Sequence, residues 1–350
     1  MFSNFLRPQR SMLLCVFLFL FSLTCLLFAS FQLTRLLTEN TAISISERQG
    51  AGFATSNTFL GLNFFFGALS GILSVIIYKR STTIVMHPSN RKWDPTKLLK
   101  RETPYRYVYR SRRRLIRIKS MVPRALISVS DEFAVYLSEN RRRIRENKYL
   151  FMSCRTGATV EMLSNKVKLS KHRLQEFLPR SYDSKNISYP CILKYGESAY
   201  SSGVFRIEDR DELDRKTLGK IINEDYIIQE AILDSREYST QFIVHDGKIV
   251  FHSSYYDEYD SKLFIWPRDK SISTTRFRLD EDDEKFKVFE EFFVDYNGLI
   301  NCNYKVHNGH LKILEFNPRL SGDIYAMSKT DLNELVDVYL KHASEQTETP

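Results

Sequence analysis

Residues 311–322 read Leu-Lys-Ile-Leu-Glu-Phe-Asn-Pro-Arg-Leu-Ser-Gly, a buried strand that ends in polar residues. Glu315 and Asn317 stand two positions apart, so their side chains point to the same face of the strand. A carboxylate and an amide oxygen side by side suit Mg²⁺, which prefers hard oxygen ligands. Arg319 follows at once and offers a planar fork for a phosphate or a carboxylate. The stretch therefore predicts a metal and anion site at a strand end.

A second stretch, residues 189–196, ends a predicted strand with Lys194. The loop that follows is made of small residues and contains Ser201, Ser202 and Gly203. Backbone N–H groups of such a loop can close on a polyphosphate, and the lysine ammonium supplies a point charge. Taken alone, this pattern is more typical of a lysine before a surface hairpin.

A third stretch is the strand predicted at 226–232, which contains Gln229 and Glu230 and is followed by Glu237. Backbone groups of a strand can pair with the edge of an adenine, and a carboxylate can accept hydrogen bonds from ribose hydroxyls. Taken alone, this pattern is more typical of a sheet edge with acids facing the solvent. Three such stretches in one chain favour a nucleotide site.

In this order and at these spacings, the three stretches resemble the ATP-grasp superfamily, which includes biotin carboxylase, the large subunit of carbamoyl-phosphate synthetase and D-alanine–D-alanine ligase. The resemblance covers residues 120–342. It implies an α+β fold, in which two α+β subdomains grip ATP, and it implies Mg²⁺ or Mn²⁺ as the metal ion. We expect the ATP-grasp domain at 151–343, with a tail at 344–350.

The resemblance also implies a role for each matching residue. Lys194 matches a lysine that contacts the phosphates, and Arg319 matches an arginine that holds the transferred phosphate or the substrate carboxylate; these are the predicted catalytic residues. The predicted metal ligands are Asn303, Glu315 and Asn317. The predicted nucleotide-binding residues are Lys166, Lys194, Ser201, Ser202, Gly203, Gln229, Glu230, Ala231, Ile232 and Glu237.

Two departures from the family pattern bear on activity. Asn303 is neutral where relatives have Asp, Glu or Gln. Compared with a relative that has an acidic residue there, the metal site carries one negative charge fewer and is expected to bind Mg²⁺ more weakly. The phosphate loop contains fewer glycines than is usual, which makes it stiffer. These two departures are also compatible with an enzyme that is slow or has lost its activity.

The chain begins with two uncharged apolar runs. Residues 12–33 are long enough to span a bilayer core and longer than the apolar part of a typical signal peptide. Residues 58–78 predict a second span that is followed by Lys79 and Arg80, as in a hairpin with both ends in the cytoplasm. Residues 40–80 also fit the start of a Rossmann-like unit. We expect a membrane anchor at 1–79, with the ATP-grasp domain on the cytoplasmic side.

The formal charge of +9 is unevenly distributed over the 350 residues. Residues 79–150 carry 20 Lys and Arg against 6 Asp and Glu, which leaves the remainder of the chain at −5. Beside a membrane anchor, an anionic lipid surface is a better partner than nucleic acid, although tyrosines and arginines alternate at 105–117. We expect 80–150 to be a basic linker or a remnant of the Rossmann-like domain that precedes the grasp domain in relatives, and we expect no nucleic-acid partner.

Periodicity predicts the remaining elements. Strands are expected at 125–129, 190–194, 226–232, 238–245, 248–256, 299–306 and 310–316. Helices are expected from about residue 131 and at 209–222, 280–296 and 331–341. Asp246-Gly247 and Asn308-Gly309 are hairpin turns. Hairpin or surface positions, rather than ligand positions, are expected for four histidines: His245, His252, His307 and His310.

The expected activity is that of a membrane-anchored, ATP-dependent ligase. It would join a carboxylate to an amine or a thiol through an acyl phosphate, with Arg268 and Lys305 as weaker candidates for binding the acceptor. The alternative is a catalytically weak or inactive nucleotide-binding scaffold at a membrane. The five cysteines show no paired spacing, so neither a zinc site nor a disulfide framework is predicted. This cysteine usage fits a reducing compartment.

Overall fold

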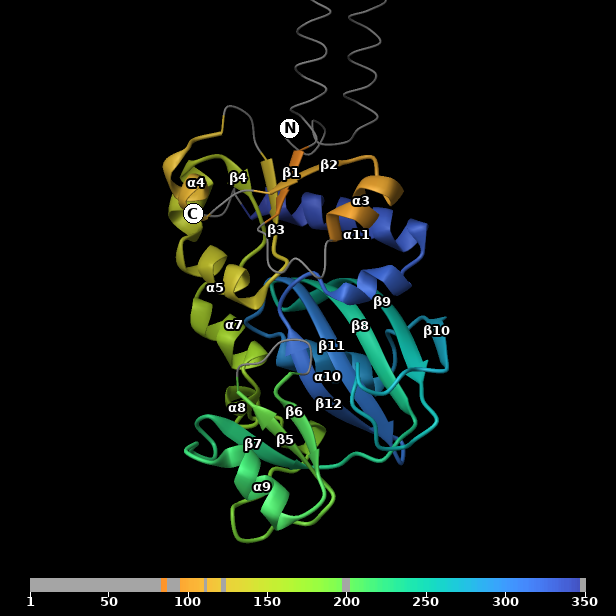
Figure 1. Cartoon of the computed structure of the whole chain (residues 1–350). Coiled ribbons are helices and arrows are strands. Elements are labelled where there is room, and N and C mark those ends of the chain that lie inside the picture. The colour runs from red at the N-terminus through yellow and green to blue at the C-terminus, as the bar shows by residue number, and fades with distance from the viewer. Residues whose placement is uncertain (1–82, 87–94, 110–111, 121–123, 197–201, 347–350) are drawn as a thin grey trace, which may run out of the picture. The chain divides into compact units, whose positions relative to one another are not determined.

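The computed structural model describes residues 83–86, 95–109, 112–120, 124–196 and 202–346 (Figure 1). Except for Thr83, these residues belong to the unit 84–350. The predicted spans at 12–33 and 58–78, and the alternative unit at 40–80, lie outside the described residues. Within the described ranges, none of the helices combines the length and the apolar character needed to cross a bilayer.

Residues 83–150 form a four-stranded sheet of order β2-β1-β3-β4, in which β1, β3 and β4 run parallel. Its elements are β1 (Thr83–Met86), α3 (Pro95–Glu102), β2 (Arg106–Tyr109), α4 (Arg112–Arg117), β3 (Arg124–Ile127), α5 (Asp131–Glu139), α6 (Arg141–Glu146) and β4 (Tyr149–Leu150). The strand predicted at 125–129 and the helix predicted from 131 are confirmed. Helix α5 begins there because the Ser130 side chain accepts a hydrogen bond from the Phe133 N–H.

The last helix, α11 (Lys329–Glu345), packs against both this sheet and the largest sheet of the protein. Its residues Leu335 and Tyr339 share one core cluster with Ile127 of β3 and with Ile243 and Phe251 of the large sheet. The helix is longer than the predicted 331–341 because Ser328 caps it, accepting a hydrogen bond from the Asp331 N–H.

The large sheet is antiparallel and has the order β10-β9-β8-β11-β12. Its strands are β8 (Arg236–His245), β9 (Lys248–Glu258), β10 (Ser273–Phe277), β11 (Gly298–His307) and β12 (His310–Asn317). The two hairpin turns are confirmed: Asp246 and Gly247 have φ of +47° and +78°, and Asn308 and Gly309 have φ of +51° and +80°. At Gly247 a Cβ atom would also come within 2.7 Å of the Val294 carbonyl oxygen, so this turn requires glycine.

Helix α10 (Glu284–Phe292) covers one face of this sheet. The helix occupies part of the predicted 280–296, and its Phe286, Phe289 and Phe292 are buried in the same cluster as Phe242 and Phe316. Asp283 begins the helix by accepting a hydrogen bond from the Lys285 N–H. The opposite face of the sheet is thereby left for the polar residues of β8, β11 and β12.

The smallest sheet has three strands in the order β6-β5-β7. The elements of this part are α7 (Gly157–Ser164), α8 (Lys166–Leu169), η2 (Gln175–Phe177), β5 (Cys191–Tyr195), β6 (Val204–Ile207), α9 (Arg210–Thr217) and β7 (Tyr226–Glu230). Helix α9 is shorter than the predicted 209–222 because Gly219 adopts a φ of +72° just beyond its end. Figure 1 shows this sheet next to the β11 and β12 side of the large sheet.

Candidate functional site

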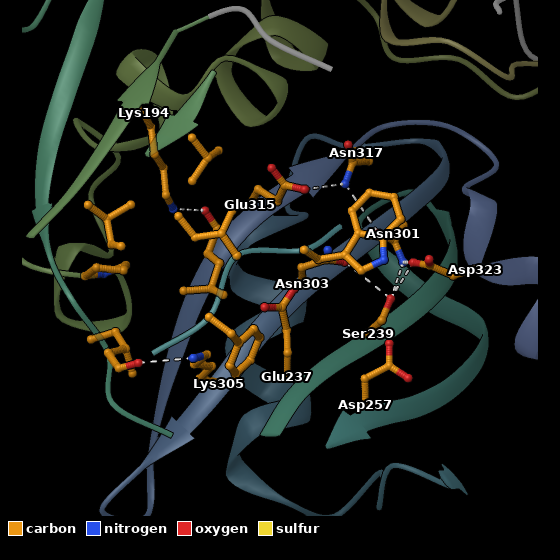
Figure 2. Close-up of a pocket in the computed structure, with 18 of the residues that line it drawn as sticks. Lys194, Glu237, Ser239, Asp257, Asn301, Asn303, Lys305, Glu315, Asn317 and Asp323 are labelled. Carbon is orange, nitrogen blue, oxygen red and sulfur yellow. Dashed lines mark hydrogen bonds between the residues drawn. The ribbon is translucent and has the colours of Figure 1, made fainter. Parts of the chain in front are cut away.

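A cavity of about 370 Å³ lies between the small sheet and the large sheet. It is lined by residues of β5 and β7 on one side, by residues of β8, β9, β11 and β12 on the other, and by the segments 263–266 and 321–323. Its volume lies in the range of small-molecule sites. Figure 2 shows its polar side chains, which gather from the two sheets.

The three predicted metal ligands lie on one face of the large sheet. Asn303 of β11 is paired in register with Glu315 of β12, and Asn301 is paired with Asn317. The Asn317 Nδ2 atom lies 3.3 Å from Oε1 of Glu315 and 3.4 Å from Oδ1 of Asn301. The Glu315 carboxylate and three asparagine side chains therefore share one face of the sheet, with the Asn317 amide nitrogen turned towards Glu315. Carboxylate and amide oxygens are ligand types that suit a hard divalent cation.

Two lysines surround this carboxylate. Lys166 of α8 places its Nζ atom 3.4 Å from Oε2 of Glu315, and Lys194 of β5 donates from Nζ to the Leu314 carbonyl at 2.9 Å. Burial by itself would raise the pKa of Glu315, but Lys166 and Lys194 together hold that pKa below its ordinary value. Burial lowers the pKa of Lys194 to about 8, and the nearby Glu315 offsets part of this effect.

Arg319 is fixed from two directions. Its Nη2 atom donates to Oδ1 of Asn317 at 3.0 Å, and its Nε atom lies 3.0 Å from Oδ1 of Asp131, the first residue of α5. The side chain of Asn317 thus bridges Glu315 and Arg319. This brings the predicted metal ligands and the predicted anion-binding arginine into one cluster, as the 311–322 stretch implies.

The predicted ribose carboxylate, Glu237, lines the cavity on β8. Burial raises the pKa of Glu237 above its ordinary value, while nearby Lys305 acts in the opposite direction. The Nζ atom of Lys305 donates to the carbonyls of Ile232 at 3.2 Å and Asp234 at 3.0 Å, and it lies 3.9 Å from the ring centroid of Phe264. Lys305 thus ties the segment after β7 to the large sheet.

The remaining predicted nucleotide residues fall into three groups. Gln229, Glu230 and Ile232 line the cavity, but the side chains of Gln229 and Glu230 bond to the backbone of 179–180. The residues absent from the cavity lining are Lys166, Ser202, Gly203 and Ala231, of which Lys166 still reaches Glu315. Ser201 lies outside the described residues.

The side chain of Arg268 contributes to the small sheet rather than to an acceptor site. Its Nη2 atom donates to the Val204 carbonyl at 2.9 Å, and its guanidinium lies over the Phe205 ring. Lys305 is engaged with the backbone after β7. Neither contact supports the weaker suggestion that these two residues bind the acceptor.

Several cavity residues were missed from the sequence. Asn301 could have been found, because it stands two positions before Asn303 on the same strand face. Its Nδ2 atom donates to Oδ2 of Asp323 at 2.9 Å and to Oγ of Ser239 at 2.8 Å. Ser239 Oγ also donates to Asp323 at 2.5 Å, and Asp257 lies in the same part of the cavity. No sequence pattern marks Asp323, which lies in the short helix η3 (Gly322–Ala326).

The expectation for the histidines is wrong at one position. His252 is not a surface residue: its side chain is 5% exposed and packs edge-on against the Phe286 ring. His310 is exposed on its strand, as expected. His245 lies half-buried at the end of β8.

Comparisons with known proteins give a partial sequence likeness and a likeness of fold. No family model matches the chain. The chain is 26% identical over 175 residues to a D-alanine–D-alanine ligase of Campylobacter jejuni, which covers 46% of the chain and 50% of that protein. The chain thus spans about half the length of the curated relatives it matches. The described fold resembles the phosphoribosylamine–glycine ligase of Thermotoga maritima, with a TM-score of 0.54, 15% identity and coverage of 75% of both chains.

The fold likeness and the motif order agree. The small sheet carries Lys194, the large sheet carries the predicted metal ligands, and the cavity lies between them. This is the two-subdomain arrangement that the resemblance to the ATP-grasp superfamily implies. The chain therefore has the ATP-grasp fold.

Proposed function

We propose that this protein is an ATP-dependent ligase that joins a carboxylate to an amine. One observation carries the proposal: Glu315 and its neighbouring asparagines on the large sheet lie beside three cationic side chains. Lys194 and Arg319 line the cavity, and Lys166 reaches Glu315 from outside the lining. In-line phosphoryl transfer needs positioned cationic groups and a bound metal ion more than it needs a nucleophilic side chain. Both similar proteins reported above are ligases by name, which supports the reaction class.

The residues present fit a magnesium site. Glu315, Asn317 and Asn303, which is opposite Glu315 in register, carry carboxylate and amide oxygens that can bind a hard cation. The Asn317 amide, whose nitrogen faces Glu315, would turn over to present its oxygen. Burial raises the pKa of Glu315, but the neighbouring lysines, with Asn317 and Arg319, lower it more. The carboxylate therefore stays ionised and can bind a cation. Bound Mg²⁺ would supply neutralisation of phosphate charge at this end of the cavity.

In the first step, an oxygen of the substrate carboxylate would bond to the γ-phosphorus of ATP. The bond to the bridging oxygen would break at the same time, giving an acyl phosphate and ADP. Lys194 and Lys166 stand where they would neutralise charge that develops on the phosphates, and Arg319 stands where it would orient the carboxylate. Glu237, on the cavity wall, would accept hydrogen bonds from the ribose.

In the second step, the bound ammonium would first release one proton to solvent, and the neutral amine nitrogen would then attack the acyl carbon. The bond from that carbon to the phosphate oxygen would break, phosphate would leave, and the nitrogen would release a second proton to the phosphate or to solvent. The cavity carries two further carboxylates, Asp257 and Asp323, in addition to Glu237 and Glu315. Acidic side chains attract an ammonium group and offer nothing comparable to a neutral thiol. The acids therefore favour an amine as the second substrate.

The proposal also places the enzyme at a membrane, with its ATP-grasp domain on the cytoplasmic side. Its support is the uncharged run at 12–33 and the basic segment that follows at 79–150. An anionic lipid surface is the partner that this charge pattern fits. This part of the proposal is independent of the chemistry.

One experiment tests the chemistry and the location. The full chain is extracted from the membrane fraction in detergent and incubated with Mg-ATP and panels of carboxylates and amines. We expect ADP and phosphate release that requires a carboxylate, and a condensed product once an amine is present. A chain that binds ATP but releases no phosphate with any acid would contradict the ligase and favour the nucleotide-binding scaffold. Recovery of the chain in the salt-washed soluble fraction would contradict the membrane attachment.

The scaffold alternative rests on the neutral Asn303, which does face Glu315. We expect Asn303→Asp to lower the Mg²⁺ concentration needed for half-maximal ATP binding by about tenfold, because a second carboxylate would act on the cation. Calorimetric titrations over a series of Mg²⁺ concentrations measure this shift. Asn308→Asp, the same change in the exposed hairpin turn, is the matched control. An unchanged Mg²⁺ requirement in Asn303→Asp would remove residue 303 from the metal site.

A further inference from the structure

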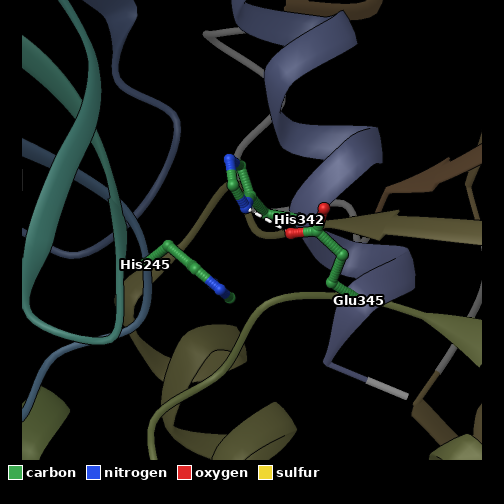
Figure 3. Close-up of side chains that lie close together, drawn as sticks. All are labelled: His245, His342 and Glu345. Carbon is green, nitrogen blue, oxygen red and sulfur yellow. Dashed lines mark ion pairs between the residues drawn. The ribbon is translucent and has the colours of Figure 1, made fainter. Parts of the chain in front are cut away.

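A cluster of three potential metal ligands, two histidines and a glutamate, lies away from the cavity, where the last turn of α11 meets the end of β8 (Figure 3). His245 is the final residue of β8, and His342 and Glu345 stand one turn apart on α11. Positions i and i+3 of a helix share one face, so both helical side chains can turn towards β8. The three potential ligand atoms lie within 4.8 Å of one another, and no other His, Cys, Asp or Glu trio among the described residues does so.

The polar atoms of this cluster are poorly satisfied by the protein itself. The Nδ1 atoms of His245 and His342 are both buried without a hydrogen-bond partner of good geometry, although Nδ1 of His342 lies 2.7 Å from Oε2 of Glu345. The two imidazole rings are 4.5 Å apart at an angle of 34°. Buried polar atoms without partners are uncommon and call for an explanation such as an ion.

Charge gives a second reason to expect a cation. Glu345 stands in the last helical turn, where the helix dipole disfavours a carboxylate and favours a cation. One bound cation would satisfy all three side chains.

We propose that His245, His342 and Glu345 form a site for a transition-metal ion of the zinc class, which ties the C-terminal helix to the large sheet. Two imidazole nitrogens and one carboxylate oxygen are typical zinc ligands, whereas Mg²⁺ prefers oxygen atoms alone. Water would complete the coordination, while Asp246, whose Oδ2 atom lies 3.7 Å from Nε2 of His245, would help to orient that ring. Glu345 is 46% exposed and free to rotate towards the ion.

This site is separate from the magnesium site of the proposed ligase. Its residues do not line the cavity between the sheets, and none of them contacts Glu315, Asn317 or Lys194 in the described structure. A metal ion here would act on stability, because it would join two segments that are about a hundred residues apart in the chain. Metal binding to the native state alone stabilises that state by mass action.

The test uses the full chain, stripped of metal by a chelator and titrated with Zn²⁺ against a chromophoric competitor. We expect saturable Zn²⁺ binding, a rise in Tm on addition of Zn²⁺, and visible absorption of four-coordinate Co²⁺ when Co²⁺ replaces it. His342→Gln and His245→Gln should each weaken Zn²⁺ binding at least about tenfold, since each removes a ligand. Glu345→Gln changes only a partly exposed side chain and should weaken binding without affecting folding.

Two controls make the result specific. His310→Gln alters an exposed histidine on another hairpin and should leave Zn²⁺ binding unchanged. Glu315→Gln changes the proposed magnesium site in the cavity and should also leave Zn²⁺ binding unchanged, which would show that the two sites are separate. Wild-type protein that binds no Zn²⁺ at micromolar concentrations, or Zn²⁺ binding that persists in Glu345→Gln and both histidine variants, would overturn the proposal.

Discussion

Replacing Glu315 by glutamine is expected to lower the rate of ATP turnover by at least about a hundredfold. The change keeps the size of the side chain but removes the only carboxylate among the predicted metal ligands. It also removes the partner of Lys166, 3.4 Å away, and the charge that partly restores the lowered pKa of Lys194. Steady-state phosphate release, measured at saturating carboxylate, amine and Mg²⁺, gives the comparison.

The matched control for this variant is Glu224→Gln, an exposed glutamate outside the cavity. It should turn over ATP at the wild-type rate. Thermal unfolding of both variants separates a loss of chemistry from a loss of fold. Turnover by Glu315→Gln within about twofold of wild type would show that the 311–322 stretch does not hold the metal ion.

Affinity for ATP is expected to fall as the pH rises above about 8, by up to about tenfold per pH unit. Burial holds the pKa of Lys194 at about 8 in the free protein, well below the ordinary 10.5 of a lysine. Bound phosphate stabilises the charged ammonium and raises this pKa. Below pH 8 the lysine is already charged, so affinity is nearly constant. Above pH 8 binding must take up a proton, so the dissociation constant increases. Calorimetry between pH 7 and 9.5 measures the slope.

Two variants identify the group responsible for this slope. Lys194→Met should bind ATP more weakly near pH 7 and should lose the slope between pH 8 and 9.5. Lys287→Met, which changes an exposed lysine on α10, should keep both the affinity and the slope. A wild-type affinity that is flat across this range, or a slope that survives in Lys194→Met, would exclude Lys194 from the phosphate site.

The large sheet was largely predictable from local patterns. Alternating apolar residues and the Asn308-Gly309 turn predict β11 and β12, and a single register then places Asn303 opposite Glu315. The phenylalanines of α10 repeat at helical spacing and are buried as expected. Strand β10 was missed because nearly all of its residues are exposed, which leaves no alternation to detect.

Long-range contacts were beyond the reach of such patterns. Asp323 enters the cavity through the turn after β12, and Asp131 reaches Arg319 from the start of α5. Neither contact leaves a trace in local periodicity. The sheet at 83–150 was also underestimated, because strands of two to four residues among many arginines resemble a linker. Their stability comes from α11, at the other end of the chain.

The central claim is that the cavity between the two sheets binds Mg-ATP with its phosphates at Lys194 and Glu315. A calorimetric titration of the full chain with a non-hydrolysable ATP analogue, with and without Mg²⁺, tests it most directly. We predict saturable binding at a single site, strengthened by Mg²⁺ in the wild type and no longer strengthened by Mg²⁺ in Glu315→Gln. Absence of binding, or binding that is indifferent to Mg²⁺ and to both Glu315→Gln and Lys194→Met, would contradict the account.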